Sequence, residues 1–270
     1  MEIVNKIDDI NELKSNKIIG NFELNNSQIR FLGVNNILFC EENLKLKNTR
    51  IFFRGDNSII YLSYPQYGNF NNAVINVRND STMYIGKDLA MGTNLQIALE
   101  EHQNFVLGDD GLIEDNVDIR TSHSFPIYNI GDKRRVNYSI SIFIGVHVWI
   151  DHFAHVSMGS KIGSGAIIGH SSFLPNYSVV PSNTKVSGNP SKIVNKNVFF
   201  TKEFTGSFRT EDTKNFSNYK SDVYEFKCVD GETLAMDKVD AILKDLTGDD
   251  RFEFIQKLFV RNKRRNRFSI

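Results

Sequence analysis

Residues 144–186, IGVHVWIDHFAHVSMGSKIGSGAIIGHSSFLPNYSVVPSNTKV, carry an aliphatic residue at every sixth position without a gap. The eight positions are Ile144, Ile150, Val156, Ile162, Ile168, Leu174, Val180 and Val186. An α-helix would repeat every 3.6 residues and a simple strand every two, so neither explains the pattern. Six residues make one short strand and a turn, and three such sides close a coil of about 18 residues. The repeat therefore predicts an all-β solenoid whose aliphatic residues point inward.

The same period occurs in two shorter runs upstream. They are Ile85, Met91 and Ile97, and then Leu107, Ile113 and Ile119. Glycines follow several aliphatic positions (Gly86, Gly92, Gly108, Gly145, Gly163 and Gly169), and we expect them at corners where the backbone turns sharply. From 17 to 78, apolar runs alternate with Asn, Asp and Gly clusters, which we interpret as irregular opening coils of the same stack.

The repeat is interrupted between Ile119 and Ile144. We expect an excursion of about seven residues here, within 124–140, by comparison with one coil of about 18 residues. A long loop that leaves a rigid scaffold is a frequent place for function.

After Lys192 the composition changes. Apolar residues at helical spacing predict a helix here, and Gly248 is placed to end it. The apolar residues are Met236, Val239, Ile242, Leu243 and Leu246. A second helix is expected from Asp249 to about Lys263, with Phe252, Ile255 and Phe259 on one face, and 201–220 is expected to be an extended linker. The expected organisation is an N-terminal segment at 1–16, a β-helix at 17–195, and a linker and C-terminal helical region with a basic tail at 196–270.

The composition points to no special partner. Lys+Arg and Asp+Glu are both 32 among 270 residues, so the net charge gives no indication of a nucleic-acid partner. The two cysteines form no disulfide framework and suit a reducing compartment. Without a signal peptide or a run of about 18 apolar residues, we expect a cytoplasmic protein.

Several short segments together resemble one family. They are Ile119-Arg120-Thr121-Ser122, Pro126-Ile127-Tyr128-Asn129, Arg135-Val136-Asn137, Ile144-Gly145-Val146-His147-Val148-Trp149-Ile150 and Gly188-Asn189-Pro190-Ser191-Lys192-Ile193. In this spacing they resemble the signature of the hexapeptide-repeat (xenobiotic-type) acetyltransferases, and most closely the capsule and cell-wall polysaccharide O-acetyltransferases. The resemblance covers roughly 17–194 and extends to the closing Asn266-Arg267-Phe268.

This resemblance implies a left-handed parallel β-helix that forms a homotrimer, with acetyl-CoA in the cleft between neighbouring subunits and no metal. A histidine on the loop would take the proton of a polysaccharide hydroxyl, and backbone N–H groups would stabilise the oxyanion. The expected site residues are His123 and Trp149 for catalysis, Ser160, Lys161, Ala166, Ser187 and Lys192 for the cofactor, and Phe125, Tyr128, Arg134 and Arg135 for the acceptor.

The sequence departs from the family at the catalytic loop. The family reads Thr-(Ser/Ala)-Asp-x-His, whereas 121–125 read Thr-Ser-His-Ser-Phe, so Phe125 stands at the usual histidine place. Residues two apart in an extended chain point to the same side, so His123 can replace it. The alternatives are another base, His147 or a neighbouring subunit's His155, or a catalytically silent scaffold.

Two further functions remain open. Some left-handed β-helices are zinc carbonic anhydrases, and His147 and His152 lie five residues apart, but the sequence offers no clear third ligand. N-acetylation of a nucleotide amino sugar is the other. The basic tail, 261–267, either complements a helix dipole or contacts an acidic polymer or membrane face.

Overall fold

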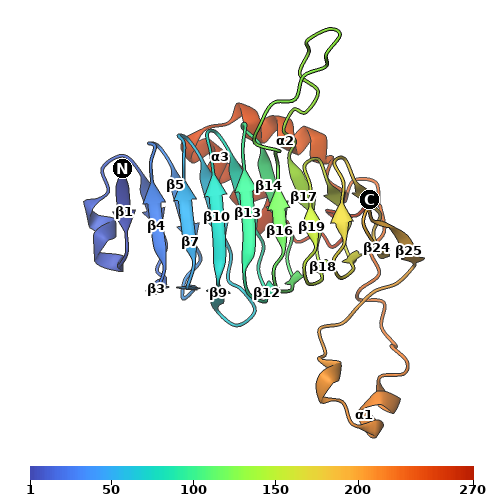
Figure 1. Ribbon diagram of the computed structural model, residues 1–270. Helices are drawn as coiled ribbons and strands as arrows, with labels where there is room; N and C mark the ends of the chain where they lie inside the picture. Colours follow the sequence, from blue (N-terminus) through green and yellow to red (C-terminus); the bar gives the residue numbers. More distant parts are fainter.

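The computed structural model describes all 270 residues as a three-sided parallel solenoid (Figure 1). The first side contains β1 (Glu2–Val4), β4 (Gln28–Phe31), β7 (Arg50–Phe53), β10 (Ala73–Val77), β13 (Leu95–Leu99), β16 (Asp118–Arg120), β19 (His155–Val156) and β22 (Phe173–Leu174). The second side contains β2 (Lys17–Ile19), β5 (Ile37–Cys40), β8 (Ile59–Leu62), β11 (Thr82–Ile85), β14 (Asn104–Leu107), β17 (Ile142–Ile144), β20 (Lys161–Ile162) and β23 (Val179–Val180).

The third side is divided into two sheets. The N-terminal sheet contains β3 (Glu23–Asn25), β6 (Lys45–Lys47) and β9 (Asn69–Asn71), and the longer sheet contains β12 (Ala90–Met91), β15 (Leu112–Ile113), β18 (Trp149–Ile150), β21 (Ile167–Ile168), β24 (Thr184–Ser187) and β25 (Lys192–Lys196). Within the sheets, antiparallel pairing occurs only at the two ends, where β1 pairs with β4 and β25 with β24. A 3₁₀-helix, η1 (Ile7–Glu12), lies beside β1 at the N-terminal end.

The core confirms the six-residue repeat. All eight aliphatic positions from Ile144 to Val186 are at most 4% exposed, and one continuous apolar core runs from Val4 to Val186. Burying each such side chain contributes roughly 1.5–3 kcal/mol. The register also confirms the opening coils, because Ile29, Ile51 and Ile75 stack directly on one another. These coils are longer than expected, with 22 or 24 residues between partners, whereas Val156 and Leu174 are 18 apart.

The corner glycines have a different role from the expected one. None of the six has a positive φ; instead, a Cβ on Gly145 would lie 2.5 Å from the backbone nitrogen of Ser164 in the next coil. They are needed for close contact between coils. Among residues other than glycine, left-handed backbone is adopted mostly by Asn and Asp, which tolerate it better than other side chains. Several of these stack as amide ladders, for example Asn94 donating to Asn116 at 2.8 Å.

The excursion lies where it was expected, but the predicted length of about seven residues is wrong. Ile119 pairs with Val156, 37 residues later, whereas Ile97 pairs with Ile119, 22 residues later, so the excursion adds about 15 residues. It leaves the corner between the first and second sides and projects as an irregular hairpin, held by an antiparallel bridge between Tyr128 and Arg135 (Figure 1).

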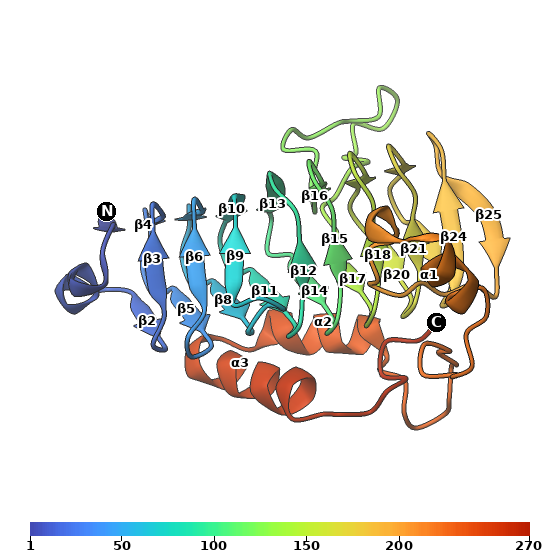
Figure 2. The same ribbon diagram turned by 90° about the horizontal axis from the view of Figure 1, so that it is seen from below.

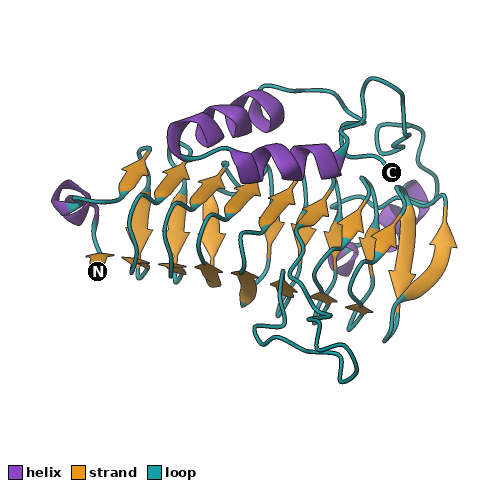
Figure 3. Ribbon diagram, turned by 90° about the horizontal axis from the view of Figure 1, so that it is seen from above, coloured by secondary structure: helices purple, strands orange, loops and turns teal.

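The C-terminal region covers the second side (Figures 2 and 3). Strands on this side are apolar on both faces, and their outer residues pack against α2 (Met236–Asp245), α3 (Gly248–Ile255) and the π-turn η3 (Gln256–Val260). Both helices were predicted, but Ile242 is 42% exposed and Gly248 begins α3 instead of following α2. None of the helices is long and apolar enough to cross a membrane.

The segment expected as an extended linker is partly helical. It contains η2 (Thr205–Ser207) and α1 (Thr210–Asn215), which extend away from the solenoid near β24 and β25 (Figure 1). The basic tail is largely structural, because buried Arg267 pairs with Asp109 at 2.6 Å and Arg265 donates to two backbone carbonyls.

Candidate active site

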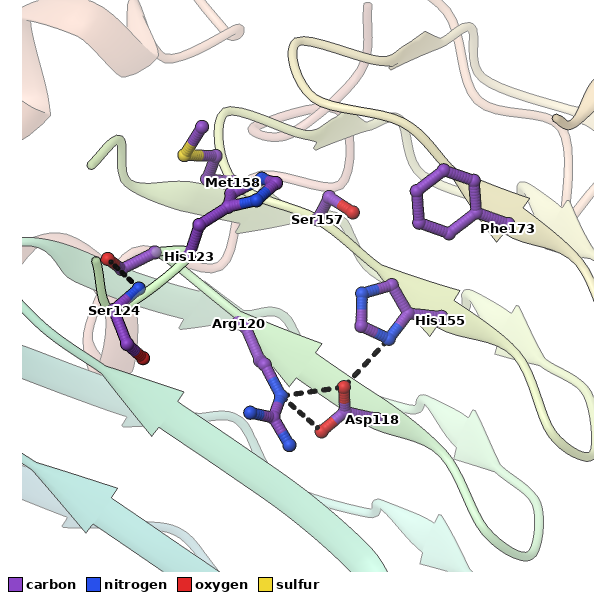
Figure 4. A pocket seen from close by; sticks show the side chains of 9 residues that line it. Asp118, Arg120, His123, Ser124, His155, Ser157, Met158 and Phe173 are labelled. Atoms are coloured by element: carbon purple, nitrogen blue, oxygen red, sulfur yellow. Dashed lines mark hydrogen bonds and ion pairs between the residues drawn. The ribbon is translucent and has the colours of Figure 1, made fainter. Parts of the chain in front are cut away.

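A hollow of about 430 Å³ lies on the first side, beside the root of the excursion (Figure 4). Its lining residues are Asp118, Arg120, Ser122, His123, Ser124, His155, Ser157, Met158 and Phe173. The strand register explains how they meet. Asp118 pairs with His155 and His155 with Phe173, so the three side chains form a column on three successive coils. Their strand neighbours Ile119 and Val156 face the core, and the alternation of a strand therefore turns this column outward.

Asp118 connects the charged groups of the hollow. Its Oδ2 lies 2.7 Å from His155 Nδ1, and both carboxylate oxygens accept from Arg120 Nε, at 2.8 and 2.9 Å. Partial burial would raise the pKa of Asp118, but the hydrogen bonds from His155 and Arg120 outweigh it, and the pKa is lowered. Asp118 is thus ionised at neutral pH and orients His155 with Nδ1 toward it. The ring of His155 also stacks on Phe173, with centroids 5.4 Å apart.

His123 lies at the rim of the same hollow, where the chain leaves β16. Its side chain is exposed, and its Nε2 lies 3.1 Å from Asn176 Oδ1 in the corner between β22 and β23. Since an amide oxygen only accepts, this contact places the proton on Nε2 and leaves Nδ1 as the basic nitrogen. The structure therefore brings together two of the histidines considered from sequence, His123 and His155.

His147 is sealed away from solvent, which removes it as a base. The ring is 1% exposed; Nδ1 lies 2.6 Å from Asp110 Oδ2 and Nε2 lies 2.9 Å from the carbonyl oxygen of Phe200. Phe200 and Tyr224, from the C-terminal region, stack on its two faces at 4.1 and 4.0 Å. Neither ring nitrogen is free for an acceptor or for zinc. The sequence could not show this, because the covering residues lie more than 50 positions away.

The acceptor candidates occupy different environments. Phe125 and Tyr128 are 78% and 57% exposed on the excursion, and the side chain of Arg134 is 86% exposed. Arg135 is not free to bind an acceptor, because its guanidinium pairs with both oxygens of Glu101 at 2.5 and 2.8 Å. Hydrogen bonds from Arg135 and Ser139 lower the pKa of Glu101 to about 2. Arg135 thus anchors the excursion.

The cofactor candidates do not converge within one chain. The side chains of Ser160 and Ala166 are fully buried, so neither can contact a cofactor directly, contrary to expectation. Lys161 Nζ pairs with Asp237 of α2 at 2.6 Å. Lys161 stays partly exposed, and Ser187 and Lys192, on β24 and β25, are accessible and form no ion pair.

Trp149 lies on the third side in β18, whereas His123 follows the first side, so the two do not share a site within one chain. Its indole ring is half-buried against Phe200, with centroids 5.6 Å apart.

The fold defines a class, the left-handed parallel β-helix, and the chain shares this fold with two solved acetyltransferases. Among solved structures, the polySia-specific acetyltransferase NeuO matches with a TM-score of 0.59 and 25% identity, over 74% of this chain and 97% of that one. The polysialic acid O-acetyltransferase OatWY matches with a TM-score of 0.52 and 20% identity, over 73% and 97% of the two chains.

Curated sequences agree with the structural matches. The polysialic acid O-acetyltransferase of Escherichia coli O1:K1 / APEC is 30% identical over 139 residues, which are 52% of this chain and 44% of that protein. That of Neisseria meningitidis is 25% identical over 126 residues, or 47% and 57% of the two chains. The chain thus matches about half the length of these relatives. No protein-family model matches it.

Proposed function

We propose that this chain is an O-acetyltransferase that moves an acetyl group from acetyl-CoA to a hydroxyl of an anionic surface polysaccharide. The observation that carries the proposal is the hollow itself, where two imidazoles and an ionised carboxylate converge beside the excursion. Acyl transfer to a sugar needs a base that works near neutral pH, and imidazole supplies one. The similarity to polysialic acid O-acetyltransferases supports the same reaction class.

His123 is the proposed general base. The acceptor hydroxyl gives its proton to His123 Nδ1 while its oxygen attacks the thioester carbonyl carbon. The carbon–sulfur bond then breaks, and the departing thiolate takes the proton to give CoA. Asn176 supports this role, because its contact with Nε2 fixes the required tautomer.

His155 is the second candidate base, and one contact favours it. Asp118 holds its Nδ1 at 2.7 Å, an arrangement that orients an imidazole and stabilises its protonated form. In that case, Nε2 would accept the proton of the acceptor.

A row of arginines on the outer face of the first side supports an anionic acceptor. A groove of about 250 Å³, lined by Arg54, Arg78 and Arg120 among others, shares Asp118 and Arg120 with the hollow. Arg30 lies in the same outward column as Arg120, and Arg30 and Arg54 flank the ring of Phe52. Arg78 and Arg120 already pair with Glu100 and Asp118, so Arg30 and Arg54, which pair with no carboxylate, are the guanidinium groups open to a carboxylate of the acceptor. The ring of Phe52 between them offers a sugar an apolar surface.

The donor is proposed to bind between subunits of a homotrimer. Ser187 and Lys192 are then its candidate contacts, with the lysine acting as a point charge toward phosphate. Trp149 would contribute to the site of a neighbouring subunit instead of its own. We place the reaction in the cytoplasm, where acetyl-CoA is available.

The direct test is to incubate the purified chain with acetyl-CoA and polysialic acid, and to measure CoA release and the mass of the polymer. We expect CoA release coupled to a gain of acetyl groups on oxygen that mild alkali removes. A neutral dextran of similar length is the control and should remain unmodified. Acetylation only of a nucleotide amino sugar would favour the N-acetyltransferase. Absence of transfer to either acceptor class would contradict the enzyme and favour a silent scaffold.

A further inference from the structure

The corner between the third and first sides gathers metal-ligating side chains that the proposed reaction does not use. Ile113, Ile150 and Ile168 stack in register, so the residues after them occupy equivalent corner positions on three successive coils. The first pair is Glu114 and Asp115, the second is Asp151 and His152, and the third ends at His170. His152 and His170 are 18 residues apart, one coil, and their ring centroids lie 6.0 Å apart.

Ligand atoms of Asp151, His152 and His170 all lie within 4.8 Å of one another. His152 Nδ1 is 3.0 Å from Asp151 Oδ1, and its Nε2 is 3.7 Å from a carboxylate oxygen of both Glu114 and Asp115. The exposed ring of His170 makes no hydrogen bond with the protein. It is therefore free to donate a lone pair.

The corner also carries uncompensated negative charge. Three carboxylates surround His152, and none of them pairs with a lysine or arginine. Carboxylates crowded around one ring repel one another. A bound cation would relieve this repulsion.

We propose that this corner binds one Zn²⁺ ion through the imidazoles of His152 and His170 and the carboxylate of Asp151. Two imidazoles with a carboxylate form a ligand set that suits zinc, and Glu114 or Asp115 can fill the fourth position. Zinc bonds are about 2.0–2.2 Å long, so binding requires side-chain rotations that draw the ligand atoms together. All these residues are accessible corner side chains on adjacent coils, and the ion would join those coils.

The test is a calorimetric titration of the chelator-treated full chain with zinc chloride. We expect one equivalent to bind, His170→Ala to weaken binding by at least about tenfold, and the wild-type melting temperature to rise with zinc. His102→Ala is the matched control: His102 is also an exposed histidine paired with a carboxylate, Asp80, at 3.0 Å, but no group of three converging ligand atoms surrounds it. It should bind zinc as the wild type does.

Three outcomes would overturn the site. They are no binding at a one-to-one ratio, equal binding by wild type and His170→Ala, and calcium chloride binding as tightly as zinc, which would point to the carboxylates alone. Circular dichroism confirms that each variant is folded. The measurement requires no acetyl transfer, so its failure and the failure of the proposed enzyme are separate results.

Discussion

At the scale of single residues, the six histidines differ in the chemistry that they can perform, because the partners of their ring nitrogens differ. Both ring nitrogens of His147 have hydrogen-bond partners and both ring faces are covered, so its role is structural. His155 has a carboxylate on Nδ1, and His123 has an amide oxygen on Nε2. A general base needs one oriented nitrogen left free, and only the last two satisfy this in the hollow.

The base is tested by comparing His123→Ala with His155→Ala. A positioned base typically contributes about 10²–10⁴-fold, so we expect His123→Ala to lower kcat by that factor, with little change in the melting temperature. The measurement is steady-state transfer to polysialic acid with both substrates varied. If the loss falls on His155→Ala and Asp118→Asn while His123→Ala keeps full activity, the base is His155.

At the scale of the element, the excursion is an irregular hairpin whose root is held to the solenoid by one defined anchor. Arg135 and Ser139 both bind Glu101, which lies in the corner between β13 and β14 of the preceding coil. This anchor fixes the root of the hairpin, and with it the position from which His123 faces the hollow. A loop of this length that was attached to the solenoid only at its two ends would be free to move.

We predict that Glu101→Gln loosens the excursion without unfolding the solenoid. Limited trypsin digestion should cut faster at Lys133, Arg134 or Arg135, and transfer activity should fall, while the melting temperature changes little. Glu100→Gln is the matched control, because the carboxylate of Glu100 pairs with Arg78 on the outer face and forms no hydrogen bond or ion pair with the excursion. Equal cleavage of the two variants would show that Glu101 is not the anchor.

The same anchor should depend on pH. The folded pKa of Glu101 is about 2, below its ordinary value of 4.5, so the ionised form is the one that the fold stabilises. The contribution is therefore complete above about pH 4.5 and is lost as the pH falls toward 2. Glu101 is partly exposed, so solvent screening keeps this contribution small.

At the scale of the whole molecule, the three sides are not equivalent. C-terminal helices cover the second side, while the first side and the excursion remain open. The excursion exposes several large apolar side chains, namely Phe125, Ile127, Tyr128, Ile130, Val136 and Tyr138, each more than half exposed. A cluster of this kind on one loop marks a contact surface.

We predict that the chain forms a homotrimer in which the excursion contacts a neighbouring subunit. Light scattering should give about three times the chain mass of 30.9 kDa. Ile130→Asp, at a position that is 87% exposed, should leave the fold intact and shift the mass toward the monomer. Lys133→Asp is the control at an exposed polar position of the same loop. A monomeric wild type with full activity would contradict the proposal that the donor binds in a cleft between subunits.

The six-residue repeat by itself determined that the chain is a β-solenoid with inward aliphatic residues, because a short strand and a turn that recur at this period bury those residues only when coils stack. The left-handed course of the coil was implied by the family resemblance and not by the period. The break in the repeat located the excursion, and a separate, helical spacing of apolar residues located the two C-terminal helices. These predictions held because local periodicity specifies which side chains are buried, and burial dominates the stability of the fold.

The site was decided by the tertiary structure. Asp118 and His155 are 37 residues apart and meet only because the excursion is looped out of the stack, so no spacing rule could pair them. The sequence left His147 as a possible base, but residues from the distant C-terminal region cover both faces of its ring in the structure. The sequence likewise left Arg135 as a possible acceptor contact, but its guanidinium binds Glu101. Ser160 and Ala166 face inward because the geometry of the corner in a closed coil decides which side chains face solvent. The sequence pattern shows only that the two residues are small.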